Sequence, residues 1–251
     1  IAYVPAYASS MIDIDNLDSL LLSSLNDKEV QKLKKQINEL SDSEFDKFIV
    51  EYLETEVNKQ VAKEKLAKLD VQLVVPSTKA IEPLKLDAWE LDLSVYTVKR
   101  GGDSFHRIIV HYVPSDKETY PASYDAIGIT WDPSKANYYS YNVSSQQHSS
   151  LKDYSQRNKG IVVFNVYDSR LSVGGVYYDA VYVTPKVSGK WMDFGAKYTH
   201  TYLTYNTSVT LNPSLSYTTP GIVSGSLNYN LKISSVERSW QKADTNAVYF
   251  K

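Results

Sequence analysis

The spacing of hydrophobic residues changes close to residue 70. Over residues 30–40, apolar side chains recur every three or four positions, which is the period of an amphipathic helix. Over residues 89–96 they alternate strictly with polar ones, which is the period of a half-buried strand. The pattern predicts an α+β protein with an N-terminal arm or signal remnant (1–10), a helical segment of about three helices (11–70) and an antiparallel β-sandwich or jelly-roll-like domain (71–251).

The helical segment contains two recognisable helix starts. Two pairs have the spacing of an N-cap and its reciprocal partner: Asn26 with Glu29, and Ser41 with Glu44. A first helix is expected over residues 14–24, ahead of both pairs. The apolar stripe after Ser41 continues to Leu69, so the third helix is expected to be one long element.

Beyond Pro76 and Pro83, strands are expected to dominate. Gly101, Gly102 and Asp103 predict a hairpin turn. Eight to ten strands are expected, over residues 89–96, 105–113, 126–131, 161–166, 176–183, 191–194, 198–211, 222–233 and 248–250. No helical pattern separates them, which favours an antiparallel sandwich or jelly roll.

The stretch from Leu203 to Ile233 consists of two amphipathic arms around Pro220 and Gly221. Leu and Tyr occupy one parity, and Ser, Thr and Asn occupy the other. A β-pore-forming protein inserts such a hairpin into lipid, and any sandwich hairpin with one wet face has the same pattern. Pro213 interrupts the first arm, which disfavours a membrane-spanning strand.

Charge argues against nucleic-acid binding. The net charge is −2; residues 1–70 carry 9 Lys or Arg against 14 Asp or Glu, and the remainder carries 18 against 15. Three excess positive charges spread over the larger part do not form a basic patch. The sequence contains no run of 18 apolar residues, so it predicts no membrane-spanning helix.

The beginning of the chain indicates export. Ala6-Tyr7-Ala8 has the small-x-small form of a signal-peptidase site, and apolar residues precede it. The alternative is an apolar N-terminal strand or arm. Together with the Ser, Thr, Asn and Tyr content of the β domain, the pattern predicts a secreted or cell-surface protein. The absence of cysteine is compatible with export and excludes disulfides.

Tyrosine is unusually frequent, with 21 residues against 6 Phe. Trp131, Tyr138, Tyr139 and Tyr141 cluster in what is expected to be a long polar loop running on to Lys159. Exposed aromatic rings stack on sugars or fill partner pockets, and loops on a rigid sandwich commonly carry binding sites. These four residues are the predicted binding site, and the alternative is that the tyrosines pin the loop to the sheet edge.

Catalytic motifs are weak. Glu90 and Asp92 share a strand face, and the run around them resembles part of the Glu-x-Asp-x-x-Glu strand of a jelly-roll glycoside hydrolase family, the laminarinase and lichenase group. That resemblance implies paired catalytic carboxylates. Val95 stands where the family has its last acid, so the acid/base partner is missing. We therefore predict no catalytic residues, although a hydrolase with an unrecognised site is a third hypothesis.

Metal and cofactor motifs are also lacking. His106 and His111 lie five positions apart, so a regular strand points them to opposite faces, and His148 and His200 are isolated in the sequence. Asp13, Asp15 and Asp18 form an acidic group without the glycine that calcium loops use, and helix N-termini favour such acids anyway. No metal site and no cofactor are predicted.

The sequence thus favours a secreted or surface-associated, non-enzymatic binding module. Its expected partner is a glycan or a protein at the cell surface, recognised through the Tyr-rich segment. The alternative is a β-pore-forming or membrane-active protein that uses the 203–233 hairpin.

Overall fold

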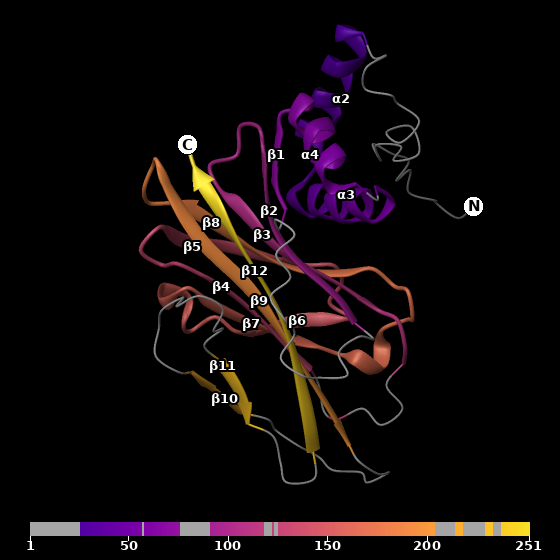
Figure 1. The fold of residues 1–251 in the computed structure, drawn as a ribbon, viewed down its shortest axis with the longest axis vertical. Coiled ribbons are helices and arrows are strands. Elements are labelled where there is room, and N and C mark those ends of the chain that lie inside the picture. Colours follow the sequence, from indigo (N-terminus) through magenta and orange to yellow (C-terminus); the bar gives the residue numbers. More distant parts are fainter. Residues whose placement is uncertain are drawn as a thin grey trace, which may run out of the picture. The chain divides into compact units, whose positions relative to one another are not determined.

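The computed structural model describes residues 26–56, 58–75, 91–117, 122, 125–203, 214–217, 229–232 and 237–251 (Figure 1). The chain separates into two compact units, residues 1–72 and 73–251. Three helices in the first unit and two five-stranded antiparallel sheets confirm the predicted α+β class with a sandwich.

The described helices are α2 (Asp27–Glu39), α3 (Asp42–Thr55) and α4 (Lys59–Lys68). Both expected N-caps form complete capping boxes. In each, the cap side chain accepts from the third helical N–H, and the Glu29 or Glu44 carboxylate accepts from the backbone N–H of the cap residue. None of the described helices is long and apolar enough to cross a membrane. The helix expected over residues 14–24 and the arm over 1–10 lie outside the described residues.

The expectation of one long third helix is wrong. The element ends at Thr55, and α4 begins after Asn58, whose side chain accepts hydrogen bonds from Gln60 and Val61. An Asn cap satisfies N–H groups that a new helix start leaves without carbonyl partners. The apolar pattern of the sequence runs across this break because Leu66 on α4 is buried, as are the apolar residues of α3.

Two five-stranded sheets form the sandwich of the second unit (Figure 1). The first has the order β1 (Val71–Val74), β2 (Leu91–Arg100), β3 (His106–Pro114), β8 (Tyr177–Pro185) and β5 (Ala136–Val143). The second has the order β12 (Glu237–Phe250), β9 (Lys190–Leu203), β4 (Asp125–Trp131), β7 (Ile161–Val166) and β6 (Ser149–Asp153). Two short helical turns, η2 (Arg157–Lys159) and η3 (Asp168–Arg170), flank β7.

Alternate residues of both sheets point inward and form one continuous hydrophobic core. Trp131, Phe164 and Phe194 are among its largest fully buried side chains. Burying a side chain of this size stabilises a fold by about 1.5–3 kcal/mol. On one side of the sandwich, β12 and β2 are tied together, because the N–H of Val95 donates to the Asp244 carboxylate over 2.7 Å. The terminal strands β5 and β6 lie at the other ends of the two sheet orders.

Several strand predictions differ from the structure. The expected strand 191–194 and the described part of the expected strand 198–211 form one continuous strand, β9, and residues 204–211 lie outside the described residues. The C-terminal strand β12 begins at Glu237 instead of Val248. The segment expected as a long polar loop contains β5 and β6. A β-bulge between Tyr138 and Ser140 shifts the register of β5, so the two-residue alternation that marks a strand is broken there.

A separate two-stranded sheet consists of β10 (Ser214–Tyr217) and β11 (Tyr229–Lys232). The antiparallel register places Leu215 opposite Leu231 and Tyr217 opposite Tyr229. Serine, asparagine and lysine occupy the intervening positions. The rest of the predicted hairpin lies outside the described residues.

Candidate functional site

Trp131, the first residue of the predicted binding site, belongs to the core. It ends β4, is fully buried, and its indole N–H donates to the carbonyl of Ala136 over 3.1 Å. Burial removes both ring faces from solvent, so Trp131 lies apart from the exposed tyrosine with which it was predicted to form a binding site. Its role is to hold the tight turn between β4 and β5, where the Asp132 carboxylate accepts a hydrogen bond from the N–H of Ser134.

Tyr138, Tyr139 and Tyr141 lie on β5, a terminal strand of the first sheet, and the expectation that they occupy a loop is wrong. Tyr138 pairs with Val183 and Tyr141 with Val181, so both pack partly against the core. Tyr139 falls in the bulge and is 57% exposed. The bulge thus directs two tyrosines inward at the sheet edge and leaves the third in solvent.

Tyr154, which the sequence did not single out, lies beside Tyr138. It follows β6, is 47% exposed, and its ring centroid lies 6.5 Å from that of Tyr138. The Arg157 guanidinium lies over the Tyr154 ring, 4.9 Å from its centroid. Burial, with the neighbouring Tyr141 second, raises the pKa of Tyr138, so its hydroxyl stays protonated. We call Tyr138, Tyr139, Tyr141 and Tyr154 the tyrosine edge.

Tyr139 is supported by a stack of rings on the outer face of the first sheet. Phe105 lies between Tyr139 and Tyr182, with centroid distances of 5.0 Å on each side and near-parallel planes. The Arg107 guanidinium lies 4.7 Å from the centre of the Phe105 ring and forms a salt bridge with Asp103 at 2.5 Å. These contacts hold the exposed Tyr139 ring in one orientation, which lowers the entropy lost when a ligand stacks on it.

Of the paired carboxylates of the glycoside-hydrolase resemblance, the structure describes only one. Asp92 is exposed on β2, and Glu90 lies outside the described residues. His106 and His111 are both buried on β3, and His106 packs against the Phe250 ring at 5.0 Å. Burial, with Lys99 as a smaller cause, lowers the pKa of His106 to about 4, so this imidazole is neutral at physiological pH.

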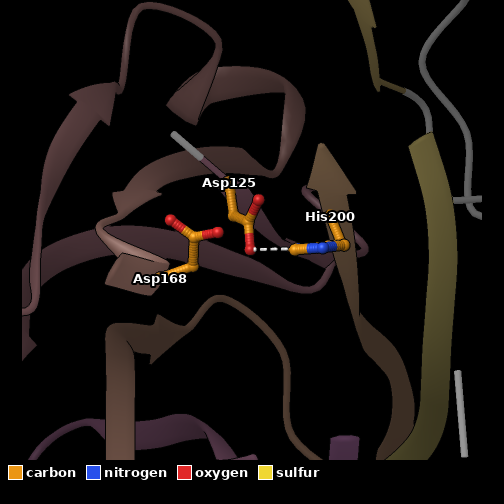
Figure 2. Close-up of side chains that lie close together, drawn as sticks. All are labelled: Asp125, Asp168 and His200. Carbon is orange, nitrogen blue, oxygen red and sulfur yellow. Dashed lines mark hydrogen bonds and ion pairs between the residues drawn. The ribbon is translucent and has the colours of Figure 1, made fainter. Parts of the chain in front are cut away.

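A second cluster, which sequence reasoning missed, occupies the inner face where β4 begins and β9 approaches its end (Figure 2). Asp125 Oδ2 lies 2.8 Å from His200 Nδ1 and also accepts from the Tyr198 hydroxyl, while Oδ1 accepts from the N–H of Thr201 over 2.8 Å. The carboxylate of Asp168, from η3, faces the same space (Figure 2). We call Asp125, Asp168 and His200 the Asp125 cluster.

A neighbouring polar group lies on the inner face of the other sheet. Asp179 is fully buried on β8 and accepts a hydrogen bond from the Ser149 hydroxyl. Burial raises its pKa to about 7, against the opposing effects of the Ser149 hydrogen bond and of the nearby Tyr112 side chain. The Tyr112 and Tyr198 rings meet edge to face at 5.8 Å, so this group adjoins the Asp125 cluster across the core.

Comparisons with known proteins assign no family. No protein-family model and no curated protein matches the chain. Solved structures give weak likenesses: the third cohesin of ScaC from Acetivibrio cellulolyticus in complex with the ScaB dockerin (TM-score 0.28, 9% identity, 36% of this chain and 68% of that one) and the sixth cohesin of scaffoldin B from the same organism (0.26, 16%, 38% and 76%). The NetB toxin of Clostridium perfringens in its membrane-inserted form gives a TM-score of 0.32 at 8% identity, over 71% of this chain and 96% of that one. Likenesses at these scores establish no shared activity.

Proposed function

We propose that this protein is a secreted or surface-associated, non-enzymatic binding module that recognises a glycan or protein partner through the tyrosine edge. The observation that carries the proposal is Tyr139, which is 57% exposed and held by the Phe105 stack. An exposed aromatic ring with a fixed orientation presents a flat apolar face at little entropic cost. Sugar rings and partner side chains both pack on such faces.

The groups around Tyr138, on the same terminal strand as Tyr139, favour a polar partner. Tyr138 and Tyr154 contribute hydroxyls beside an aromatic surface, and Arg157 contributes a guanidinium. Hydroxyl and guanidinium groups donate hydrogen bonds in fixed directions, which gives specificity for oxygen-rich ligands. Among the strands that the structure describes, β5 ends its sheet, so one side of its backbone is paired with none of them and can also donate and accept.

The test is capture by isolated cell walls in a co-sedimentation assay. We expect Tyr139→Ala and Tyr154→Ala, combined in one variant, to abolish sedimentation with walls without changing the unfolding midpoint, because both side chains are largely exposed. Carbohydrate-stripped and protease-treated walls separate the glycan from the protein partner.

A matched control is available on the second sheet. Trp191 and Tyr249 are 63% and 40% exposed, lie opposite each other on β9 and β12, and pack at 5.4 Å. Replacing both by Ala removes a similar exposed aromatic area outside the tyrosine edge. Undiminished capture by the Tyr139/Tyr154 variant, or equal loss in the Trp191/Tyr249 variant, would contradict the proposal.

A second candidate function is membrane insertion by the segment around β10 and β11. It rests on one observation: these strands form a sheet of their own, with Leu215 opposite Leu231 and polar residues at the next positions. A pair that belongs to neither sandwich sheet can rearrange without dismantling the core. Its amphipathic sequence suits a lipid–water boundary.

Dye leakage from anionic and neutral liposomes tests this candidate. Leu215→Lys is expected to reduce leakage strongly, because a lysine facing lipid costs about 2–4 kcal/mol at mid-membrane depth. Ser216→Lys, one position along on the opposite parity, is the control and is expected to leave leakage largely intact. Equal leakage from both variants would remove β10 from the mechanism.

A further inference from the structure

The Asp125 cluster brings together, from distant parts of the chain, three side chains of types that can ligate metals. Asp125 begins β4, Asp168 begins η3, and His200 lies near the end of β9. One ligand atom from each lies within 4.8 Å of the other two. Among the residues that the structure describes, no other three such side chains converge in this way. Figure 2 shows the two carboxylates and the imidazole directed at one another.

We propose that the Asp125 cluster binds one divalent transition-metal ion of the Zn²⁺ type. Imidazole nitrogen combined with carboxylate oxygen is a ligand set that suits Zn²⁺, whereas Ca²⁺ and Mg²⁺ take oxygen ligands almost exclusively. Three protein ligands leave one position of a tetrahedral ion for water.

The three side chains need little rearrangement to coordinate one Zn²⁺ ion. Two ligand atoms that share a Zn²⁺ ion at about 2.0–2.1 Å lie roughly 3.3 Å apart. Asp125 Oδ2 and His200 Nδ1 are already 2.8 Å apart, so they fit one coordination shell after a small expansion. Asp168 is only half-buried and starts a short turn, so its carboxylate closes the remaining gap by rotating its side chain.

The surrounding contacts orient the ligands. The N–H of Thr201 and the hydroxyl of Tyr198 both donate to Asp125, and hydrogen-bonded carboxylates of this kind are typical of metal centres. The His200 ring is packed between Trp240, at 4.9 Å, and Tyr202, at 5.7 Å. Two carboxylates in this largely buried place repel each other, and a divalent cation between them replaces that repulsion with attraction.

Isothermal titration of the whole, EDTA-dialysed protein with ZnCl₂ tests the proposal. We expect one ion per chain and a rise in unfolding midpoint with Zn²⁺. Asp168→Asn is the main variant, because it removes a ligand from the half-buried side of the cluster and leaves the Asp125 hydrogen bonds in place. Its affinity is expected to fall at least about ten-fold. His200→Gln is expected to lose binding as well.

His148→Gln is the control for adventitious binding, because His148 is half-buried beside Tyr177 and lies outside the cluster. Each variant is first compared with the wild type in EDTA by near-UV circular dichroism; if His200→Gln fails to fold, Asp168→Asn decides. Unchanged affinity in Asp168→Asn, loss of binding in His148→Gln, equal binding of Mg²⁺ or no binding at all would overturn the proposal. Tetrahedral absorption bands of a Co²⁺ derivative that disappear in Asp168→Asn would support it.

Discussion

Asp179→Asn is expected to change how stability depends on pH. Asp179 is fully buried, and burial raises the pKa of its carboxyl from 3.8 to about 7. In the unfolded chain this carboxyl ionises near pH 4. Between pH 4 and pH 7 the folded protein therefore holds one more proton at this position than the unfolded chain. Because stability falls with pH wherever the folded state binds more protons, Asp179 destabilises the wild type progressively over that range.

The size of this destabilisation follows from the difference between the pKa values of Asp179 in the folded and unfolded states. The interval covers roughly three pH units, and each corresponds to about 1.4 kcal/mol, so the wild type loses up to about 4 kcal/mol from this group by pH 8. Asparagine is uncharged at every pH and keeps an oxygen that accepts from the Ser149 hydroxyl. The free energy of unfolding of the variant minus that of the wild type is thus expected to increase by up to about 4 kcal/mol between pH 4 and pH 8.

Urea unfolding followed by tryptophan fluorescence at a series of pH values measures this difference. Asp92→Asn is the matched control, because Asp92 is an exposed aspartate on a strand of the same sheet. Subtracting the pH dependence of Asp92→Asn from that of Asp179→Asn removes the general effect of losing one carboxylate and leaves the effect of burial at Asp179. A difference that stays constant to within about 1 kcal/mol over the range would refute the buried-carboxyl argument.

Three further predictions concern local features of the fold and are tested by urea unfolding. Gly160→Ala is expected to cost about 3 kcal/mol or more, because a Cβ there would lie 2.1 Å from the Trp131 carbonyl oxygen; Gly102→Ala also has positive φ but open space, and should cost only about 1 kcal/mol. Burial lowers the pKa of Lys197 to about 8, so below pH 8 the folded protein contains a buried positive charge that destabilises it, whereas near pH 10.5 the amine is neutral in the folded state. Lys197→Met should therefore raise the free energy of unfolding by about 1–2 kcal/mol at pH 7, and this increase should disappear towards pH 10.5. Asn58→Ala should cost about 1 kcal/mol and lower helix content by far-UV circular dichroism, because it removes the α4 cap.

Features that depend on neighbouring residues could be predicted from the sequence. The capping boxes at Asn26 and Ser41 formed because both partners lie within one helical turn. The strand over Ile161–Val166 has the bounds expected from its apolar run. The break before α4 was missed because its cap, Asn58, lacks the Glu or Gln three residues later that completes a capping box; Val61 stands there.

The binding surface could be predicted only in part. The tyrosines of β5 were recognised by composition, but a bulge is a property of two paired strands and leaves no mark in one of them. Trp131 showed the same aromatic signal as Tyr139, yet one is fully buried and the other exposed. Composition identifies rings that are able to bind, and the register of the strand decides which of them reach solvent.

The Asp125 cluster could not be predicted from spacing, because its residues are brought together by two strand registers. The β4–β9 ladder pairs Ala126 with Thr199, so its next step places Asp125 beside His200. The β4–β7 ladder pairs Asp125 with Val166, and Asp168 follows two positions later. Each register is set by apolar pairs elsewhere along the strands, since a slip of one residue would expose the whole inner face.

The inner face of the sandwich is apolar along most of β4 and β9 and becomes polar only in its last layer, at Tyr198, Asp125 and His200. Replacing buried ionic groups by hydrophobic residues of similar volume often leaves the stability of a protein unchanged or increases it, so stability alone does not explain this polar layer. Every group in it needs a partner, because a buried polar atom without one costs about 1–3 kcal/mol. Asp125 meets that requirement with three donors that all come from β9. The layer therefore holds the end of β9 in place, and a metal ion bound by the Asp125 cluster would hold it more strongly. The two proposals are thus linked along the chain, because β10 and β11 follow β9 in sequence. If β10 and β11 insert into membranes, Zn²⁺ should slow liposome leakage by the wild type and leave leakage by Asp168→Asn unchanged.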